Sequence, residues 1–405
     1  DYADVGDSDV DFVLRIANIS PSGSGARSIR GGAIMNEASG EFSLAFGSAS
    51  TDAQSSEPVR FSVNAPGTSP HMAIMGKTRS GKSRTGLDVA SELVKSASLP
   101  LILIDPKGEF VNDGKLVAKP EWQGDTLDRY FPGIQPLDIP ETRIPLDFLH
   151  RPQDASDADL AKLAASFRDS FQKCLRAKGD VALNMMRETV VELLRTKAGP
   201  VSLRDVKEAF AEAAEQSGKS GGGISAKLSE IESLGLFAPT MAPSEFFARR
   251  WVVSFGSCSD EPKKLAIFLL LDALNSYMLS LPDSGVDTEG YRSLRHLLVV
   301  DEAREILSYK HGALSSLIRK SASKGGVTML LSQGPDDFDQ EDDDFLEQMG
   351  TVGVFALSSS NVKSLTGTFG KRMKVEEFAD KALPAGTALV KMPGQGTKKV
   401  IAWKP

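Results

Sequence analysis

One stretch of this 405-residue chain sets the architecture of the rest: Gly76-Lys77-Thr78-Arg79-Ser80-Gly81-Lys82-Ser83. It matches the pattern G-x-x-x-x-G-K-[S/T], whose glycines allow backbone N–H groups to curve around phosphate oxygens. A short apolar strand over 71–75 precedes it and a helical pattern over 83–96 follows it, as a phosphate-binding loop requires. We expect Lys82 to reach the β- and γ-phosphates of a nucleotide and Ser83 to ligate Mg²⁺ through its hydroxyl. The predicted nucleotide-binding residues are Gly76, Lys77, Thr78, Arg79, Ser80, Gly81, Lys82, Ser83 and Arg84.

An acidic pair follows a second apolar strand, which is predicted over 296–300. We expect Asp301 to hold Mg²⁺ through water and Glu302 to orient and polarise the attacking water. Asp-Glu after an apolar strand is also a common signal for the start of a helix, so the assignment depends on the phosphate-binding loop. Two adjacent carboxylates with separate roles favour hydrolysis over phosphoryl transfer to a specific acceptor.

A polar amide ends a third apolar strand, predicted over 327–332. Nucleotide binds at the carboxyl ends of parallel strands, so Gln333 is placed to hydrogen-bond the γ-phosphate or the lytic water. A strand-end cap is the alternative role for this side chain.

Outside these motifs the sequence alternates between strand and helix patterns, which predicts an α/β fold with a mainly parallel sheet. Helical periodicity alone fills 157–234, with four segments near 157–177, 181–197, 202–217 and 224–234. Three alternating segments, 10–16, 41–46 and 59–63, predict a small β element before the loop. Later helices are predicted over 262–280, 312–323, 342–349, 360–368 and 374–381. The expected organisation is an N-terminal β element (1–66), a core (67–150 and 245–405) and a helical insertion (151–244).

Composition limits the function classes. The formal net charge is −7, so any surface that binds nucleic acid must be local or assembled in an oligomer. No apolar run reaches the length of a membrane helix and no signal peptide is recognisable, so we expect a cytoplasmic protein without membrane contact. The missing initiator Met indicates a piece of a longer chain. The four histidines, His71, His150, His296 and His311, show no metal-ligand spacing, so any nuclease activity must come from a partner.

With these elements placed, the sequence resembles the HerA/FtsK superfamily of additional-strand P-loop ATPases. The resemblance covers about residues 65 to 400 and rests on 71–83, on Leu103-Ile104-Asp105-Pro106-Lys107-Gly108-Glu109-Phe110, on 300–304 and on 331–337. Within the superfamily, 265–277, 290–296 and 321–338 look most like the C-terminal ATPase domain of the DptH family, which belongs to phosphorothioation-dependent restriction. The resemblance implies a RecA-like core, ATP and Mg²⁺ as ligands, and a homo-oligomeric ring, commonly a hexamer, around double-stranded DNA.

The resemblance also implies a cation donated by the neighbouring subunit. The family's Gly-Arg-Lys run is replaced here by Ile318-Arg319-Lys320-Ser321-Ala322-Ser323-Lys324-Gly325. Arg319 is therefore the first candidate, with Lys320, Lys324 and Arg372 behind it, and each is otherwise a solvated charge.

Three charged residues after the strand at 101–104 have open roles. Asp105 either supports the Mg²⁺ shell or forms an Asp-Pro turn. Lys107 is expected to be a solvated turn charge, and Glu109 is a candidate contact with an adjoining subunit. Two charged runs lie elsewhere: Arg249-Arg250 is interpreted as surface charge rather than pore lining, and Glu341-Asp342-Asp343-Asp344 as the start of a helix.

The leading hypothesis is an ATP-hydrolysing motor that translocates or remodels double-stranded DNA in bacterial defence or restriction, with partner proteins such as a nuclease or other restriction subunits. Lys82, Glu302, Gln333 and Arg319 are the expected catalytic residues, and Ser83 and Asp301 the expected metal ligands. Two alternatives stay open. One is a secretion or conjugation ATPase that moves protein or a protein–DNA complex, and the other is an ATP-dependent oligomeric scaffold for partner proteins.

Overall fold

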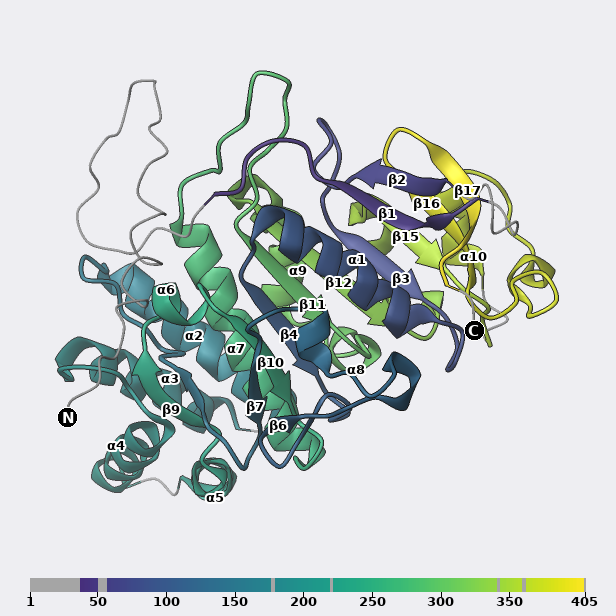
Figure 1. Ribbon diagram of the computed structural model, residues 1–405. Coiled ribbons are helices and arrows are strands. Elements are labelled where there is room, and N and C mark those ends of the chain that lie inside the picture. The colour runs from purple at the N-terminus through teal and green to yellow at the C-terminus, as the bar shows by residue number, and fades with distance from the viewer. Residues whose placement is uncertain are drawn as a thin grey trace, which may run out of the picture. The chain divides into compact units, whose positions relative to one another are not determined.

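A computed structural model describes residues 37–49, 57–175, 179–218, 221–340, 343–358 and 362–403. Eleven strands of the described chain form one sheet (Figure 1). Their order is β2 (Pro58–Ser62), β1 (Ser43–Ser48), β17 (Gly396–Ile401), β16 (Thr387–Met392), β15 (Thr351–Val354), β3 (Met72–Met75), β12 (Gly326–Ser332), β11 (His296–Val300), β4 (Leu101–Asp105), β10 (Arg250–Ser254) and β7 (Gln135–Asp138). The predicted strand over 10–16 lies outside the described residues.

The sheet is parallel from β15 to β7 and antiparallel from β15 to β2. The mainly parallel α/β sheet is confirmed. β1 and β2 join the antiparallel edge, where Ser48 of β1 pairs with Ile401 of β17. The described part of the predicted N-terminal β element thus continues the central sheet.

Alternate side chains of the central strands enter two hydrophobic cores, one on each face of the sheet. In β11, Leu297 and Val299 face the core that contains α1 (Lys82–Ala97), whereas Leu298 and Val300 face the other core. Every residue of β11 is buried, because helices cover both faces. The second core contains α7 (Asp260–Ser280) and α9 (Gly312–Lys320).

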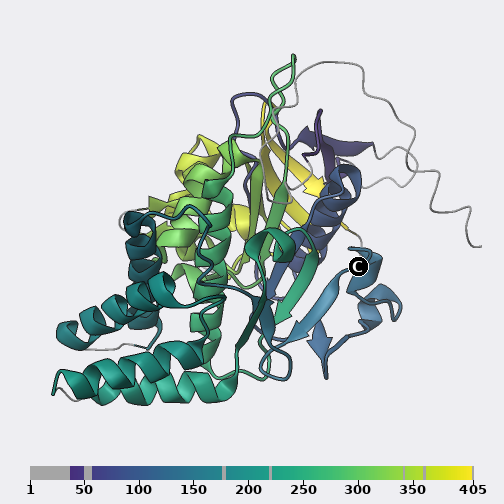
Figure 2. The ribbon, with the colours of Figure 1, turned by 90° about the vertical axis from the view of Figure 1, so that its left-hand side faces the viewer.

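Four helices of the predicted insertion pack on the α7 side of the sheet. They are α2 (Asp157–Leu175), α3 (Asp180–Thr196), α4 (Leu203–Gln216) and α5 (Gly222–Leu234). Figure 2 shows these teal helices on one side of the sheet and the blue helix α1 on the other. α7 lies between the sheet and α2, so it is apolar around most of its surface.

A buried polar cluster joins α2 to α7 and to the start of α9. The Ser170 hydroxyl of α2 donates to Asp272 Oδ2 of α7 (2.6 Å) and lies 3.0 Å from Nε2 of His311, which precedes α9. His311 Nε2 also lies 3.4 Å from Asp272 Oδ1. The cluster therefore fastens the helical insertion to α7 and α9.

The remaining short elements, which the sequence patterns did not indicate, connect the main ones. They are β5 (Val111–Asn112), β6 (Lys115–Leu116), β8 (Ile144–Leu146), β9 (Phe237–Met241), α6 (Pro243–Phe246), α8 (Arg304–Leu307), β13 (Asp339–Gln340) and 3₁₀ turns at Pro120–Trp122, Leu127–Arg129 and Pro335–Asp337.

Two predicted helices are wrong. Residues 343–349 form strand β14 (Asp343–Asp344), which pairs with β13, and a 3₁₀ turn (Phe345–Gln348). The side chains of Phe345 and Leu346 are buried in the core, and the described acidic residues of the run form β14 rather than the start of an α-helix. The helix expected over 374–381 is only a 3₁₀ turn (Val375–Phe378), whereas α10 (Lys363–Phe369) agrees with expectation. The helix expected over 312–323 ends at Lys320 and continues as a 3₁₀ turn (Ser321–Lys324).

Candidate functional site

The phosphate-binding loop lies between β3 and α1 and is tied to the strands beside it. The Gly76 N–H donates to the Ser332 carbonyl at the end of β12 (3.1 Å). The Lys77 N–H donates to the Ala356 carbonyl after β15 (2.8 Å). The strand–loop–helix context predicted from the sequence is therefore present, with the loop at the carboxyl ends of the parallel strands.

The acidic pair after β11 meets the start of α1. Ser83 Oγ lies 3.4 Å from Asp301 Oδ1, and Lys82 Nζ lies 3.4 Å from Glu302 Oε1. Lys82 and Asp301 are almost completely buried. The fold thus brings together four residues that the sequence places in two distant motifs.

Three side chains hold the carboxylate of Glu302. Lys107 Nζ lies 2.7 Å from Oε1, Lys82 Nζ approaches the same oxygen, and Gln333 Nε2 donates to Oε2 (2.9 Å). Burial acts to raise the pKa of Glu302, but the charge of Lys82 and the hydrogen bonds from Lys107 and Gln333 outweigh it, so the pKa is lowered. Glu302 also has φ of 47°, an uncommon conformation for a residue other than glycine. Its backbone and side chain are both fixed by their surroundings.

Asp301 differs electrostatically from its neighbour. Burial raises its pKa to about 6, although the charge of Lys82 opposes this shift. A hydroxyl and a carboxylate that meet in a buried position are hard oxygen ligands, which suit Mg²⁺. Ser83 and Asp301 therefore have the chemistry that the predicted metal site requires.

Hydrogen bonds to Asp105 fix the turn after β4 that contains Lys107. Asp105 accepts hydrogen bonds from the Gly108 N–H (3.0 Å), the Phe110 N–H (2.9 Å) and the Ser254 hydroxyl (3.0 Å). Gly108 has φ of 72°, and a Cβ there would lie 2.5 Å from the Cα of Gly256. These contacts favour the turn-forming role of Asp105. Glu109 Oε2 lies 3.7 Å from Lys119 Nζ.

Lys107 lies in a turn and its side chain is 40% exposed, as expected for a turn charge, but its ion pair with Glu302 was not expected. Burial acts to lower the pKa of Lys107. The hydrogen bond to Glu302 and the negative charge of Glu302 together act more strongly in the opposite direction, so the pKa is raised. The sequence carries a signal for this role only in the run from Asp105 to Phe110.

Gln333 is positioned by a carboxylate four residues later. Asp337 Oδ2 accepts hydrogen bonds from the Ser332 hydroxyl (2.6 Å), the Gln333 N–H (3.3 Å) and the Gly334 N–H (3.2 Å). The turn therefore points the Gln333 amide at Glu302. The contact of Gln333 is with Glu302 itself, a partner that the sequence did not indicate.

The other predicted binding residues differ in their exposure. Thr78 and Arg79 are exposed, Ser80 is buried, and Lys77 Nζ lies 2.5 Å from Asp380 Oδ2. The Arg84 guanidinium carbon lies 4.8 Å from the centre of the Trp403 ring, a contact that the sequence did not reveal.

The candidate trans-acting cations stay predictions. Arg319 and Lys320 are exposed in the last turn of α9, Lys324 Nζ lies 2.9 Å from Asp283 Oδ1, and Arg372 is exposed. Arg319 takes no part in the contacts around Glu302 described above.

Arg249 and Arg250 lie at the start of β10, at the opposite end of the sheet from the phosphate-binding loop. Arg249 Nη2 donates to Glu245 (2.6 Å), and Arg250 donates to the carbonyls of Leu99 (3.0 Å) and Pro132 (2.7 Å). These contacts give both arginines a structural role at this end.

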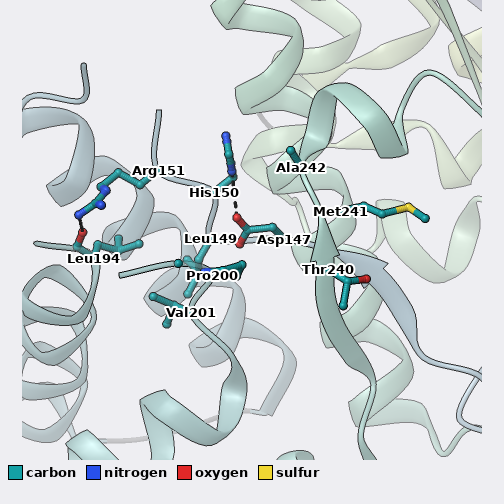
Figure 3. Close-up of a pocket in the computed structure, with 11 residues that line it drawn as sticks. Asp147, Leu149, His150, Arg151, Leu194, Pro200, Val201, Thr240, Met241 and Ala242 are labelled. Carbon is teal, nitrogen blue, oxygen red and sulfur yellow. Dashed lines mark hydrogen bonds and ion pairs between the residues drawn. The ribbon is translucent and has the colours of Figure 1, made fainter. Parts of the chain in front are cut away.

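A separate pocket of about 230 Å³ lies beside β9 and the end of α3 (Figure 3). There His150 Nδ1 lies 2.9 Å from Asp147 Oδ2. None of the lining residues belongs to the phosphate-binding loop or the acidic pair. Among the described residues, no group of three or more His, Cys, Asp or Glu side chains is arranged to hold a metal ion. No described helix has both the length and the apolar character needed to cross a membrane.

Fold and site together define a RecA-like protein of the P-loop NTPase class. Residues 47–239 match the family described as helicase HerA, central domain. A comparison with curated proteins finds no match.

Solved structures of VirB4 and of the conjugative coupling protein TrwB share the fold. VirB4 of Thermoanaerobacter pseudethanolicus is 16% identical with a TM-score of 0.65, and the match covers 92% of this chain and 98% of VirB4. The conjugative coupling protein TrwB, in an unbound form, is 16% identical with a TM-score of 0.57, and the match covers 82% of this chain and 84% of TrwB. A structure of TrwB with ADP and Mg²⁺ is 15% identical with a TM-score of 0.54, and the match covers 92% of this chain and 96% of TrwB.

Proposed function

We propose that this chain is an ATP-hydrolysing motor domain of the HerA/FtsK type that acts on double-stranded DNA. The observation that carries the proposal is the convergence of Lys82, Glu302 and Gln333 at the phosphate-binding loop, with Ser83 beside Asp301. TrwB, which shares the fold, has been solved with ADP and Mg²⁺, which supports the same ligands here.

In the proposed reaction each residue has a separate task. Lys82 leaves Glu302 to neutralise the β- and γ-phosphates, and Glu302 accepts a proton from the attacking water. Gln333 orients the water or the γ-phosphate from the far side of Glu302. Ser83, and Asp301 through water, would hold Mg²⁺, which would supply positive charge beside the phosphate oxygens. Arg319 of a neighbouring subunit is the proposed trans-acting cation in a homo-oligomeric ring, commonly a hexamer.

The cellular role is the finer part of the proposal. The stretches 265–277, 290–296 and 321–338 resemble DptH-type ATPases, which supports a cytoplasmic role in phosphorothioation-dependent restriction beside a nuclease or other subunits. A conjugation or secretion ATPase is the second candidate, because VirB4 and TrwB share the fold over most of their lengths.

The test is steady-state ATP hydrolysis with and without duplex DNA. We expect DNA to stimulate hydrolysis, Lys82→Ala to abolish nucleotide binding, and Glu302→Gln to bind ATP without turnover. A rate of ATP hydrolysis that is the same with and without DNA would favour the secretion candidate. ATP-dependent oligomers without hydrolysis would favour a scaffold, and appreciable turnover by Glu302→Gln would refute the role of Glu302.

A further inference from the structure

The sheet order fixes the direction in which a nucleotide extends from the phosphate-binding loop. β3 leads into the loop, with β12 on one side and β15 on the other. Glu302 and Gln333, which are proposed to act near the γ-phosphate, follow β11 and β12, and Lys107, which contacts Glu302, follows β4. All three strands lie on the β12 side of β3. The base is at the opposite end of a nucleotide from the γ-phosphate, so a nucleotide bound in this way would extend toward β15, β16 and β17.

On that side, Trp403 lies directly against the phosphate-binding loop. Gly81 has φ of 106°, and a Cβ there would lie 2.1 Å from Trp403 Nε1 and 2.8 Å from Cδ1. The Arg84 guanidinium stacks over the indole at 4.8 Å. An aromatic plane and a guanidinium plane therefore stand together at the start of α1, immediately after Lys82 and Ser83.

Backbone hydrogen bonds hold this arrangement in place. The Gly386 N–H donates to the Ser80 carbonyl of the loop (2.9 Å). The Gly386 carbonyl accepts from the N–H groups of Ala402 (2.7 Å) and Trp403 (3.3 Å). One residue thus links the phosphate-binding loop to the segment that carries the indole, and Figure 1 shows the yellow strands β16 and β17 beyond β15.

The indole has an unused hydrogen-bonding group. Trp403 Nε1 is buried and has no hydrogen-bond partner within the part of the chain that the structure describes. An indole N–H is only a donor, and a buried donor without an acceptor is unfavourable. Ribose oxygens, phosphate oxygens and base ring nitrogens are all acceptors, and the flat face of a base stacks on aromatic and guanidinium groups.

We propose that Trp403 and Arg84 form the subsite for the base and ribose of the bound nucleotide. The subsite rests on the proposed nucleotide-binding function and adds to it the residues that contact the part of ATP other than the triphosphate. The sequence alone did not indicate Trp403, because it lies far along the chain from the loop.

The experiment compares two ligands by titration calorimetry, each with Mg²⁺: ATP, and inorganic tripolyphosphate, which has no base or ribose. We expect Trp403→Ala to weaken ATP binding about tenfold, in the range that one base–aromatic stack contributes. Tripolyphosphate binding should stay within twofold of wild type. Trp403→Phe keeps an aromatic face but loses the indole N–H, so its ATP affinity should lie between those of wild type and Trp403→Ala.

Tryptophan fluorescence gives a second readout. The other two tryptophans, Trp122 and Trp251, are buried in the hydrophobic cores. ATP should change the emission of the wild type but not that of Trp403→Phe, and tripolyphosphate should change it much less than ATP does.

Each outcome has one reading. Equal weakening of both ligands in Trp403→Ala would mean that the indole only supports the loop, and unchanged ATP affinity would mean that the base binds elsewhere; either result overturns the subsite. Lys82→Ala should lose both ligands. If the wild type binds neither ligand, the proposed function fails and the subsite fails with it.

Discussion

Glu302 accepts contacts from two lysines, and only one of them, Lys82, belongs to a recognisable nucleotide-binding motif. In the proposed reaction Lys82 leaves Glu302 and binds the phosphates of the nucleotide. Lys107 and Gln333 then remain to hold the carboxylate, and Lys107 is aimed by a turn that Asp105 fixes with three hydrogen bonds.

Removal of Lys107 should therefore impair the chemical step rather than binding. We expect Lys107→Ala to lower kcat about ten- to hundredfold, which corresponds to a hydrogen bond to a charged group. The Kd for ATP should change little, and Lys107→Arg should recover much of kcat. Steady-state kinetics and equilibrium binding separate the two effects. A Lys107→Ala variant with normal kcat, or with ATP affinity reduced as much as kcat, would contradict this role.

At this scale the sequence marks residues in local patterns and misses those that act across the fold. Lys82, Ser83, Asp301 and Glu302 stand in short motifs after apolar strands. Trp403 reaches the loop only because β17 lies in the same sheet as β3, and no sequence spacing encodes that contact.

Helix α4 shows how a local signal stabilises an element. Ser202 Oγ accepts a hydrogen bond from the Asp205 N–H (3.2 Å), and Asp205 Oδ2 accepts one from the Ser202 N–H (2.7 Å). Both bonds satisfy N–H groups that a helix start leaves without partners.

We expect Ser202→Ala to lower the free energy of unfolding by about 1 kcal/mol, because α4 loses its N-terminal cap. Urea denaturation followed by circular dichroism measures the change. Ser233→Ala is a matched control, since that exposed hydroxyl only bonds the Glu230 carbonyl in α5. Equal losses in the two variants would mean that the cap contributes nothing specific.

Helices with a strong helical periodicity of apolar residues, such as α2 to α5, could be predicted from the sequence. Short elements without a periodic pattern could not. β7 reads Gln-Pro-Leu-Asp and lies at the edge of the sheet, where proline is tolerated and no alternating pattern is required. The segment 343–349 begins within an acidic run that suits a helix start, but it forms a short strand and a 3₁₀ turn with Phe345 and Leu346 buried.

For the whole molecule, two buried histidines link stability to pH. Burial lowers the pKa of His71 to about 4 and that of His296 to about 3, from an ordinary value of 6.5. Below pH 6.5 the unfolded chain takes up these protons and the folded chain does not, so stability falls as the pH falls.

Each histidine should lower the free energy of unfolding by up to about 1.4 kcal/mol per pH unit between pH 6 and its folded pKa. Urea denaturation at pH 7.5 and 5.5 measures this slope. His296→Gln should reduce the slope, and the partly exposed His150 provides the control variant His150→Gln. An unchanged slope in His296→Gln would refute the assignment.

At the same scale, the alternation of strands and helices is sufficient to predict the parallel α/β sheet. It does not predict that β1 continues the sheet beside β17, because that pairing joins segments near opposite ends of the described chain. Long-range pairing of this kind depends on which edge of the sheet is left open.

The buried cluster of Ser170, Asp272 and His311 has a mechanical consequence. Separating α2 from α7 and α9 would leave buried polar groups without partners, which costs about 1–3 kcal/mol for each group. This cluster therefore opposes movement of α2 relative to α7 and α9. We therefore expect α2, α7 and α9, which carries Arg319 in its last turn, to move together.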